Sequence, residues 1–537
     1  MSDTPAMSDS PSARQTPAPG DPPDSTRSHN LLVGAVFIGA CILYGLTCAP
    51  GVLWQDSAMF QHRVWFFDVR GESGLPLAHP LYILSARAFT LAIPFGDFAW
   101  RVNMFSALCG AAAVAVAMRL LLNLTRSPAA ALVGTLSLAV SHTFWTHCAI
   151  AEVYNLYALG LVVELWCIER WMHTRRWTWL AMAILVNGLN LSNHLLAILH
   201  WPVYLGLLIW AIRSGMLRAK HLTGLVLALI AGSSPYLWLI GENISVGQGV
   251  VAALKESLVG PEERSSKVLS TDFSFARQAG RSALYFAMNF PTPVVVLAAL
   301  GFWKWAGTPG KRWFALTAGA IFAINSVFAF RYPVPDQFVF FTPAYVIVAL
   351  LIGIGAADML NRRRDSSPSD PRVRQVTKLA IVAALLPIVV YAAAPSVFRM
   401  TGFSIGAKRD IPFRDTLAYF IQPWKTGDDS ARRFADAAFE VAAPDGLLYA
   451  DTTIKNVLVY VRDVQGKAPG VTLTTGHDTI PRPPAINREP QAVEPFVNAG
   501  KAFICTDAAE YIPDWIREQW KLEPAGIIFR ILPIRQP

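Results

Sequence analysis

The sequence predicts an all-α polytopic membrane protein that ends in a small C-terminal α/β domain, and three observations lead to this fold class. Hydrophobic residues make up 53% of the 537 residues and charged residues 15%, against about 25% charged in soluble domains. Long uncharged stretches recur between clusters of charge. Beyond Arg399, short apolar runs typical of strands alternate with helical patterns. So few charges exclude a cytosolic globular enzyme, because they cannot cover the surface of a soluble protein of this length.

The uncharged stretches predict the transmembrane helices. A helix needs about 20 apolar residues to cross a bilayer, and the stretch between Arg176 and Arg213 is long enough for two short spans. We therefore predict about eleven spans, at 31–50, 101–123, 128–148, 152–171, 177–192, 194–212, 222–241, 287–306, 313–330, 338–357 and 379–398.

Basic residues predict the orientation, because Lys and Arg concentrate in cytoplasmic loops. They gather in alternate loops, among them Arg175 with Arg176, Lys304 with Lys311, and a cluster that begins at Arg362. The N-terminus is therefore expected in the cytoplasm and the tail outside. The net charge of +9 is accounted for by these loops, so nucleic-acid binding is not expected.

Composition divides the chain into three domains. Residues 1–29, rich in Pro, Ser, Asp and Thr, predict a disordered cytoplasmic leader, and the span after it is expected to be uncleaved. Residues 30–398 form the transmembrane domain, with long outer loops at 51–100 and 242–286. Residues 399–537 predict a soluble extracytoplasmic α/β domain with a parallel sheet.

Finer patterns predict elements in the first outer loop and in the tail. Ser57–Val69 and Leu81–Ile93 are apolar-periodic but too short to span, and are expected to lie as helices in the membrane interface. The tail elements are expected at 432–441, 447–450, 454–464, 471–474, 491–499, 502–505, 512–520 and 526–531.

Polar residues collect at the predicted outer face, where charge is costly and often functional. Taken singly, each has an ordinary structural role open to it: Asp56 could cap the helix that follows it, Glu152 could complement a helix dipole, and Arg331 could pair with Asp336. Their gathering on one face, together with His79, Asn193 and His194, favours a site.

The motifs around these residues resemble a known family. They are Pro50-Gly-Val-Leu-Trp-Gln-Asp56-Ser, Ala78-His79-Pro80-Leu-Tyr82, Trp100-Arg-Val-Asn103-Met-Phe-Ser106, Phe144-Trp145 with Ala151-Glu152-Val-Tyr154, Gly188-Leu-Asn-Leu-Ser-Asn193-His194, and Arg331-Tyr-Pro-Val-Pro-Asp336 followed by Phe341-Thr-Pro-Ala-Tyr345. Together they are similar to the protein O-mannosyltransferase-like family of the GT-C glycosyltransferases, over about residues 31–360.

The resemblance implies a glycosyltransferase that moves a sugar from a polyprenyl-phosphate-linked donor to an acceptor hydroxyl on the non-cytoplasmic face. It places the catalytic carboxylate at Asp56, where a general base is worth about 10²–10⁴-fold, and a direct displacement would invert the anomeric centre. Arg331 is the first candidate for the donor phosphate, because guanidinium binds phosphate bidentately, with Arg63 and Arg87 as alternatives. Donor or substrate contacts are expected from His79, Arg87, Glu152, Tyr154, Asn193, His194, Arg331 and Asp336.

The expected partners are the polyprenyl-phosphate-sugar donor, a protein or glycan acceptor and membrane lipid, at the inner membrane of a bacterium with the tail in the periplasm or outside. No cofactor is assigned. Glu152 with His147 and Asp56 could hold a divalent ion, although their spacing is not diagnostic.

Two other classes stay open. A transporter or flippase of a lipid-linked substrate would place buried charges near the bilayer midplane, whereas the charges are expected here at one face. A non-catalytic membrane scaffold would use the exported tail to bind partners.

Overall fold

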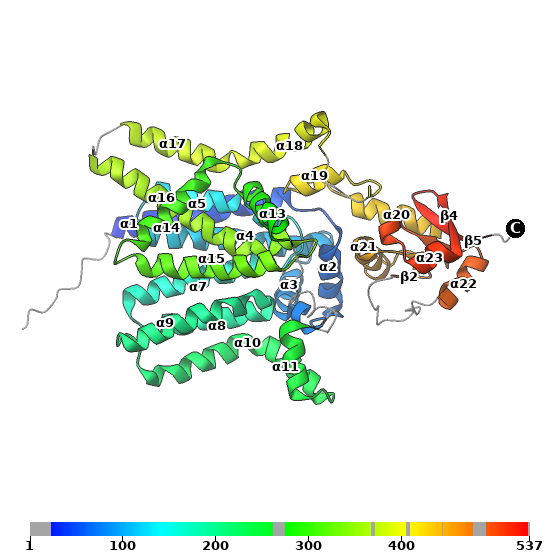
Figure 1. Cartoon of the computed structure of the whole chain (residues 1–537), viewed down its shortest axis with the longest axis horizontal. Helices are drawn as coiled ribbons and strands as arrows, with labels where there is room; N and C mark the ends of the chain where they lie inside the picture. Colours follow the sequence, from blue (N-terminus) through cyan, green and yellow to red (C-terminus); the bar gives the residue numbers. More distant parts are fainter. Residues whose placement is uncertain are drawn as a thin grey trace, which may run out of the picture.

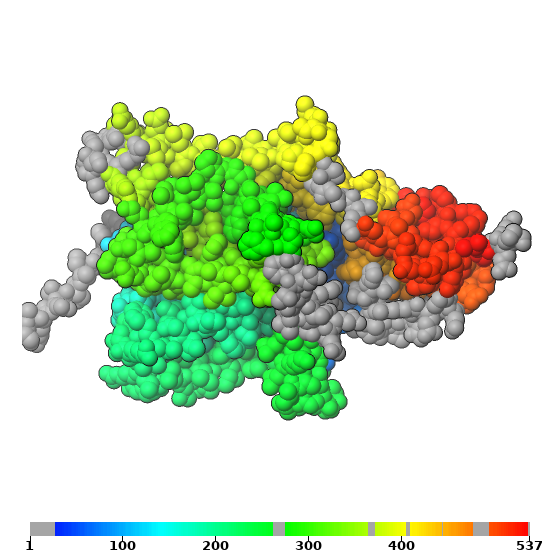
Figure 2. All heavy atoms as spheres, in the orientation of Figure 1, coloured from blue at the N-terminus to red at the C-terminus, as the bar shows by residue number. Residues whose placement is uncertain are grey.

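The computed structural model describes residues 23–72, 74–260, 274–366, 371–403, 409–442, 444–475 and 490–534. Long helices lie side by side in one bundle, and a smaller domain that contains a sheet is attached at one end of it (Figure 1). In the space-filling view this domain stands out from the end of the bundle as a separate mass (Figure 2). Residues 1–22 of the predicted leader, 1–29, lie outside the described residues. The remainder of the leader belongs to α1, which begins at Pro23.

Six stretches of helix among the described residues are long and apolar enough to cross a membrane. A bilayer core offers backbone groups no water, so a spanning segment must satisfy its own hydrogen bonds, as a helix does. The six stretches are α1 (Pro23–Thr47), α4 (Phe98–Thr125), η2 with α9 (Leu195–His200, Trp201–Arg213), η3 with α10 (Ala219–His221, Leu222–Ser245), α15 (Arg312–Arg331) and η5 with α16 (Gln337–Phe341, Thr342–Ser366).

Three further predicted spans are bent helix pairs rather than straight helices. They bend by 68° between α5 (Pro128–Ala139) and α6 (His142–Cys148), and by 42° between α17 (Pro371–Leu385) and α18 (Pro387–Thr401). The expected straight span 287–306 is wrong: α13 (Phe275–Asn289) meets η4 and α14 (Pro293–Val295, Val296–Ala306) at 106°. Pro291 and Pro293 explain this break, because proline lacks the N–H donor and restricts the preceding residue.

Two more helices, α7 (Tyr154–Thr174) and α8 (Trp177–Asn193), correspond to the predicted spans at 152–171 and 177–192. Helix α8 has 17 residues, slightly less than a typical span, and α7 carries Glu164, Glu169 and Arg170. With them, the described residues account for ten of the eleven predicted spans, the exception being 287–306.

The helices expected in the first outer loop are present as α2 (Asp56–Phe66) and α3 (Pro80–Ala92), with the short η1 (Leu75–Leu77) between them. Pro80 opens α3 at a position where its missing N–H costs nothing. In the second outer loop, α11 (Val250–Val259) follows α10, and α13 begins at Phe275.

Small residues let the bundle helices approach closely, as is usual in membranes. A Cβ atom added at Gly188 of α8 would lie 2.7 Å from the carbonyl oxygen of Leu229 on α10. One added at Gly355 of α16 would lie 1.9 Å from the carbonyl oxygen of Leu297 on α14. Larger residues at these positions would force the helices apart.

A buried polar network ties α7, α8 and α9 together. The Glu164 carboxylate of α7 is fully buried and accepts hydrogen bonds from the Tyr204 hydroxyl (2.6 Å), His200 Nδ1 (3.1 Å) and the side-chain amides of Asn187 and Asn190 (both 3.2 Å). The prediction that buried charged residues lie at one face of the membrane therefore does not hold for Glu164. Because four protein donors saturate this carboxylate, we interpret the network as structural.

The C-terminal domain contains a five-stranded sheet in the order β2-β1-β3-β5-β4. Strand β1 (Leu447–Tyr449) pairs in parallel with β2 (Thr472–Thr474) and β3 (Ala502–Ile504). The expected all-parallel sheet is wrong at one edge, where β5 (Ile528–Pro533) runs antiparallel to both β3 and β4 (Trp520–Ala525). A two-residue turn joins β4 to β5, and such a turn can connect only antiparallel strands.

The helices of this domain are α19 (Thr416–Ile421), α20 (Ser430–Ala442), α21 (Thr452–Asp463), α22 (Pro490–Asn498), η6 (Ala509–Tyr511) and α23 (Asp514–Gln519). Helices α21, α22 and α23 pack on the sheet, and α19 packs on α18 of the bundle. At the bundle, the indole N–H of Trp54 donates to Ser430 Oγ (3.0 Å), and the side-chain amide of Asn456 donates to the carbonyl of Gln55 (3.1 Å). The small domain is therefore anchored directly beside the start of α2.

The Glu164 network generates a stability prediction. Glu164→Leu leaves four buried donors without their acceptor, and an unsatisfied buried polar group costs about 1–3 kcal/mol. We expect the detergent-solubilised variant to unfold at a clearly lower temperature than the wild type, and Glu164→Gln, which keeps one acceptor oxygen, to lose less. Equal stability of the Leu variant and the wild type would show that the network does not hold the helices together.

Candidate active site

Asp56 stands where the chain leaves α1 and turns into α2. It is the first residue of α2 and its side chain is exposed, while the residue before it, Gln55, is the N-cap and makes no side-chain capping bond. Gln55 has φ 59° and ψ −133°, a region that non-glycine residues rarely adopt and that tends to occur at functional sites. Asp56 thus complements the helix dipole from inside the first turn and does not act as the N-cap.

Two hydrogen bonds stabilise the strained turn before Asp56. The backbone N–H of Gln55 donates to the carbonyl of Thr453 at the start of α21 (3.2 Å), and its carbonyl accepts from Asn456. On the other side, Ser57 Oγ accepts from the N–H of Ala151 at 3.2 Å. The position of Asp56 is therefore set jointly by the C-terminal domain and by the turn between α6 and α7.

Glu152 lies in that turn, and its backbone is fixed by one serine. Ser106 of α4 accepts from the N–H of Glu152 (3.1 Å) and donates to its carbonyl (3.2 Å). The Tyr82 hydroxyl of α3 lies 3.0 Å from Ser106 Oγ. These hydrogen bonds involve the backbone of Glu152, so they position its carboxylate without bonding to it.

The carboxylates of Asp56 and Asp336 both come within electrostatic range of Glu152 at this end of the bundle. Burial raises the pKa of Glu152 well above its ordinary value, and the nearby carboxylates of Asp56 and Asp336 raise it further, because like charges disfavour another ionisation. Burial also raises the pKa of Asp336, which precedes η5. The structure therefore places Asp56 and Asp336, which come from two other turns, near Glu152.

Tyr154 and His194 line the inner side of this cluster. The ring of Tyr154 stacks on His147 with 5.0 Å between centroids and lies 5.2 Å from the ring of His194. Phe340 of η5 contacts both rings, at 6.1 Å each. These aromatic contacts join the turn before α7, the end of α8 and the segment after Asp336.

His79 and Asn193 connect α3 to the same place. His79 is buried in the left-handed conformation (φ 49°) directly before α3, and its Nδ1 lies 2.6 Å from the carbonyl of Asn193. The Asn193 amide donates to the carbonyl of Val153 at 3.1 Å. Burial, and in second place the neighbouring His194, lowers the pKa of His79 well below its ordinary value, so this imidazole is neutral at neutral pH.

The candidate arginines occupy three different settings. Arg63 is buried, and its guanidinium donates to the carbonyls of Asp68 (3.1 Å) and Leu77 (3.2 Å), so it holds the loop before η1 and is already engaged. Arg331 is exposed at the last position of α15. Arg87 is half-buried on α3, about 10 Å along the helix axis from Pro80 at 1.5 Å per residue.

Residues of the tail also reach the cluster, although no motif in the sequence predicted them. The Tyr419 ring of α19 lies within electrostatic range of Glu152. The Arg414 guanidinium lies over the rings of Tyr419 (5.1 Å) and Trp54 (5.5 Å). Lys425 donates to the carbonyls of Tyr419 (2.8 Å) and Gln422 (2.7 Å), and burial lowers its pKa to about 7. Their local sequence carries no signal of this docking.

Within the described ranges, no group of three or more His, Cys, Asp or Glu side chains has an arrangement that could hold a metal ion. The carboxylates of Asp56 and Glu152, with His147, therefore do not fit the divalent ion considered from the sequence. We derive no step through a metal.

Known proteins resemble this chain in sequence and in fold. A family model described as the protein O-mannosyl-transferase TMEM260 N-terminal domain matches residues 74–216. The mouse protein O-mannosyl-transferase TMEM260 is 29% identical over 222 residues, which cover 38% of this chain and 29% of the mouse protein. The match thus spans under a third of that relative's length.

Among solved structures, ArnT from Cupriavidus metallidurans in the apo state has a TM-score of 0.55 at 14% identity, covering 95% of this chain and 98% of ArnT. The same protein bound to undecaprenyl phosphate has a TM-score of 0.54 at 15% identity, covering 94% and 97%. The likeness therefore extends over the bundle and the C-terminal domain together.

The raised pKa of Glu152 predicts a pH-dependent stability. The folded chain binds this proton more tightly than the unfolded chain, so wild-type stability falls as the pH rises above the ordinary value of 4.5. Glu152→Gln stays neutral, so we expect it to melt at a higher temperature than the wild type at about pH 8, with the difference shrinking towards pH 4.5. Thermal unfolding of both proteins across this range checks the prediction, and a difference independent of pH would contradict it.

The chain has the fold of the GT-C membrane glycosyltransferases, and the resemblance to the protein O-mannosyltransferase-like family that its motifs predict is confirmed, with the family model matching residues 74–216.

Proposed function

We propose that this protein is a glycosyltransferase that moves a sugar from a polyprenyl-phosphate-linked donor to an acceptor hydroxyl at the non-cytoplasmic face of the membrane. The observation that carries the proposal is the meeting of Asp56, Glu152 and Asp336 at one end of the bundle. Support for the donor class comes from ArnT, whose structure was determined with undecaprenyl phosphate bound. The name of the mouse relative, a protein O-mannosyl-transferase, favours a protein or glycan hydroxyl as acceptor.

Asp56 is the proposed general base. A sugar acceptor hydroxyl is a poor nucleophile and needs a base within hydrogen-bond reach. Asp56 is the exposed member of the three carboxylates, whereas Glu152 and Asp336 are partly covered and their pKa values are raised. The activated hydroxyl attacks the anomeric carbon from the face opposite to the lipid phosphate. The lipid phosphate leaves as the new bond forms, which inverts the anomeric centre.

Glu152 is proposed to contact the donor while it carries a proton. Its raised pKa favours the neutral acid, which can donate a hydrogen bond to a sugar or phosphate oxygen. A neutral Glu152 also lessens the repulsion that an anionic donor would meet beside Asp56 and Asp336. We propose that Tyr154, Asn193, His194 and His79 shape the pocket around that donor.

Arg331 is the proposed ligand of the donor phosphate. It ends α15 five residues before Asp336 and is exposed, next to apolar spans along which a prenyl chain can lie. Since Arg63 is engaged by backbone carbonyls, Arg87 is the alternative left from the sequence. Arg414 joins it as a second alternative, because aromatic rings hold it beside Tyr419.

We propose the location and orientation that the loop charges predict. The protein lies in the inner membrane of a bacterium, with the N-terminus in the cytoplasm and the C-terminal domain in the periplasm or outside. The carboxylate cluster and that domain then share the outer face, since Gln55 contacts α21 directly. The transporter alternative is not favoured, because protein donors saturate Glu164 inside the bundle.

Asp56→Asn tests the base. Asn keeps the size and polarity of the side chain but cannot accept the proton, so transfer should fall by about two or more orders of magnitude while donor binding persists. Asp97→Asn is a matched control at the same end of the bundle: Asp97 caps α4 by accepting from the N–H groups of Ala99 and Trp100, and Asn caps about as well as Asp. Transfer near the wild-type rate in the Asp56 variant would rule out the base.

Arg331→Lys tests the phosphate ligand. Lysine keeps the charge but loses the planar fork that binds phosphate at two points. We expect donor affinity to fall about tenfold, with acceptor affinity little changed, in binding measurements on the purified protein. Arg87→Lys, measured alongside, should leave donor affinity unchanged. The reverse result, with loss in the Arg87 variant alone, would transfer the role to Arg87.

A further inference from the structure

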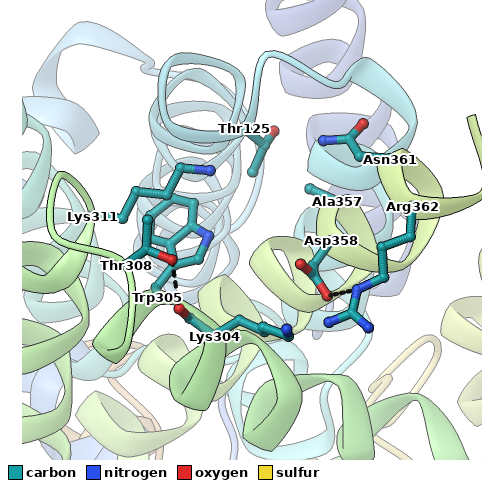
Figure 3. Close-up of a pocket in the computed structure, with 9 residues that line it drawn as sticks. All are labelled: Thr125, Lys304, Trp305, Thr308, Lys311, Ala357, Asp358, Asn361 and Arg362. Atoms are coloured by element: carbon teal, nitrogen blue, oxygen red, sulfur yellow. Dashed lines mark hydrogen bonds and ion pairs between the residues drawn. The ribbon is translucent and has the colours of Figure 1, made fainter. Parts of the chain in front are cut away.

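A polar pocket lies at the end of the bundle opposite to the carboxylate cluster (Figure 3). It forms where α4 ends, where α14 turns into α15, and on the last turns of α16. Its volume is about 140 Å³, equal to four or five waters at ~30 Å³ each. The lining residues are Thr125, Lys304, Trp305, Thr308, Lys311, Ala357, Asp358, Asn361 and Arg362.

Positive charge dominates this lining. Lys304, Lys311 and Arg362 face one carboxylate, Asp358, among the residues that line the pocket, and Figure 3 shows these side chains around its rim. Arg362 Nε lies 2.8 Å from an oxygen of Asp358. The Asp358 carboxylate neutralises the Arg362 guanidinium, so Lys304 and Lys311 give the lining a net positive charge.

The pocket also has a fixed inner wall. Trp305 and Ala357 are buried behind it, and the Lys311 ammonium lies 5.0 Å from the centroid of the Trp305 ring, in cation–π range. The Thr308 hydroxyl donates to the carbonyl of Lys304 at 2.8 Å. Lys304 lies in the last turn of α14, and these contacts tie the following turn, which carries Lys311, to that helix.

The surroundings indicate a lipid rather than a soluble anion. Trp303, next to Lys304, is 72% exposed, and Leu300 and Leu316 are also exposed on the outward faces of α14 and α15. Tryptophan beside an apolar helix surface is typical of the level of the lipid headgroups. The pocket thus opens where acyl chains can lie along α14 and α15 while a headgroup enters between the lysines.

We propose that this pocket binds the headgroup phosphate of an anionic phospholipid. Ammonium and guanidinium groups form charge-assisted hydrogen bonds with phosphate oxygens, and basic pockets between transmembrane helices favour anionic headgroups. The exposed amide of Asn361 adds a donor for the headgroup. The proposal concerns a structural lipid far from the carboxylates and does not depend on the proposed transfer reaction.

The test measures phospholipid retained by the full-length protein. Protein from vesicles of equal parts phosphatidylglycerol and phosphatidylcholine is analysed by native mass spectrometry after mild removal of detergent. Wild type should retain phosphatidylglycerol selectively, and Lys304→Gln/Lys311→Gln should retain about an order of magnitude less, since each surface cation contributes about a severalfold preference. Arg218→Gln/Lys220→Gln is the matched control: it removes two exposed cations from the turn before α10, at the same end of the bundle, and should bind like wild type.

Two further arms separate phospholipid binding from misfolding and from binding of free phosphate. Asp358→Asn removes the carboxylate of the lining and should increase retention, a change that misfolding would not produce. Millimolar inorganic phosphate should not displace the lipid. Equal losses in both double variants, equal retention of phosphatidylcholine, an unchanged or lowered retention in Asp358→Asn, or displacement by phosphate would each overturn the proposal.

Discussion

The cost of burying the Glu152 carboxylate beside Asp56 and Asp336 is the constraint on which this end of the bundle depends. Burial raises the pKa of Glu152, and the two neighbouring carboxylates raise it further, so its turn must be held by other groups. Ser106 holds the backbone of Glu152, and Ser57 joins the start of α2 to Ala151. The fold thus opposes the repulsion with neutral hydrogen bonds between backbone and hydroxyl groups, which add no further charge to the acidic end.

The C-terminal domain takes part in the same arrangement. Gln55 is held in a strained conformation by Thr453 and Asn456 of α21, and Trp54 is bonded to Ser430 of α20. A positive φ costs of order 1–3 kcal/mol for a non-glycine residue. The local sequence of α2 does not favour this conformation at Gln55, so the partners in the C-terminal domain must stabilise it. The domain therefore holds Gln55, the residue that precedes the proposed base, in place. This explains why Tyr419 and Arg414, far along the chain, lie at the same place.

The sequence was sufficient for features that the bilayer imposes and insufficient for those that long-range packing decides. Spans could be predicted because a membrane forces backbone bonds inside each segment. Asp56, Glu152 and Asp336 could be grouped because alternate turns share one face. Other contacts depend on partners that the local sequence does not reveal. Arg63 binds backbone carbonyls, Lys425 docks on carbonyls of the tail, and Glu164 accepts four hydrogen bonds. Strand β4 was missed because half of its residues are exposed, so it lacks an apolar alternation.

The pocket beside Trp305 is lined mainly by cations, whereas carboxylates gather at the opposite end of the bundle, and this has a consequence for the anionic donor that we propose. The lysines around Trp305 attract phosphate at one end, while three carboxylates would repel it at the other. A donor phosphate can therefore be accommodated beside the carboxylates only if cations there offset them or if a carboxylate is protonated. The chain offers both means: Arg331 ends α15 five residues before Asp336, Arg414 of the tail lies over the ring of Tyr419, and burial favours a proton on Glu152. In the proposed reaction, Asp56 takes the proton of the acceptor hydroxyl as the lipid phosphate leaves with one more negative charge. Loss of that proton to solvent restores the charge of Asp56, and the repulsion then favours release of the phosphate from this end.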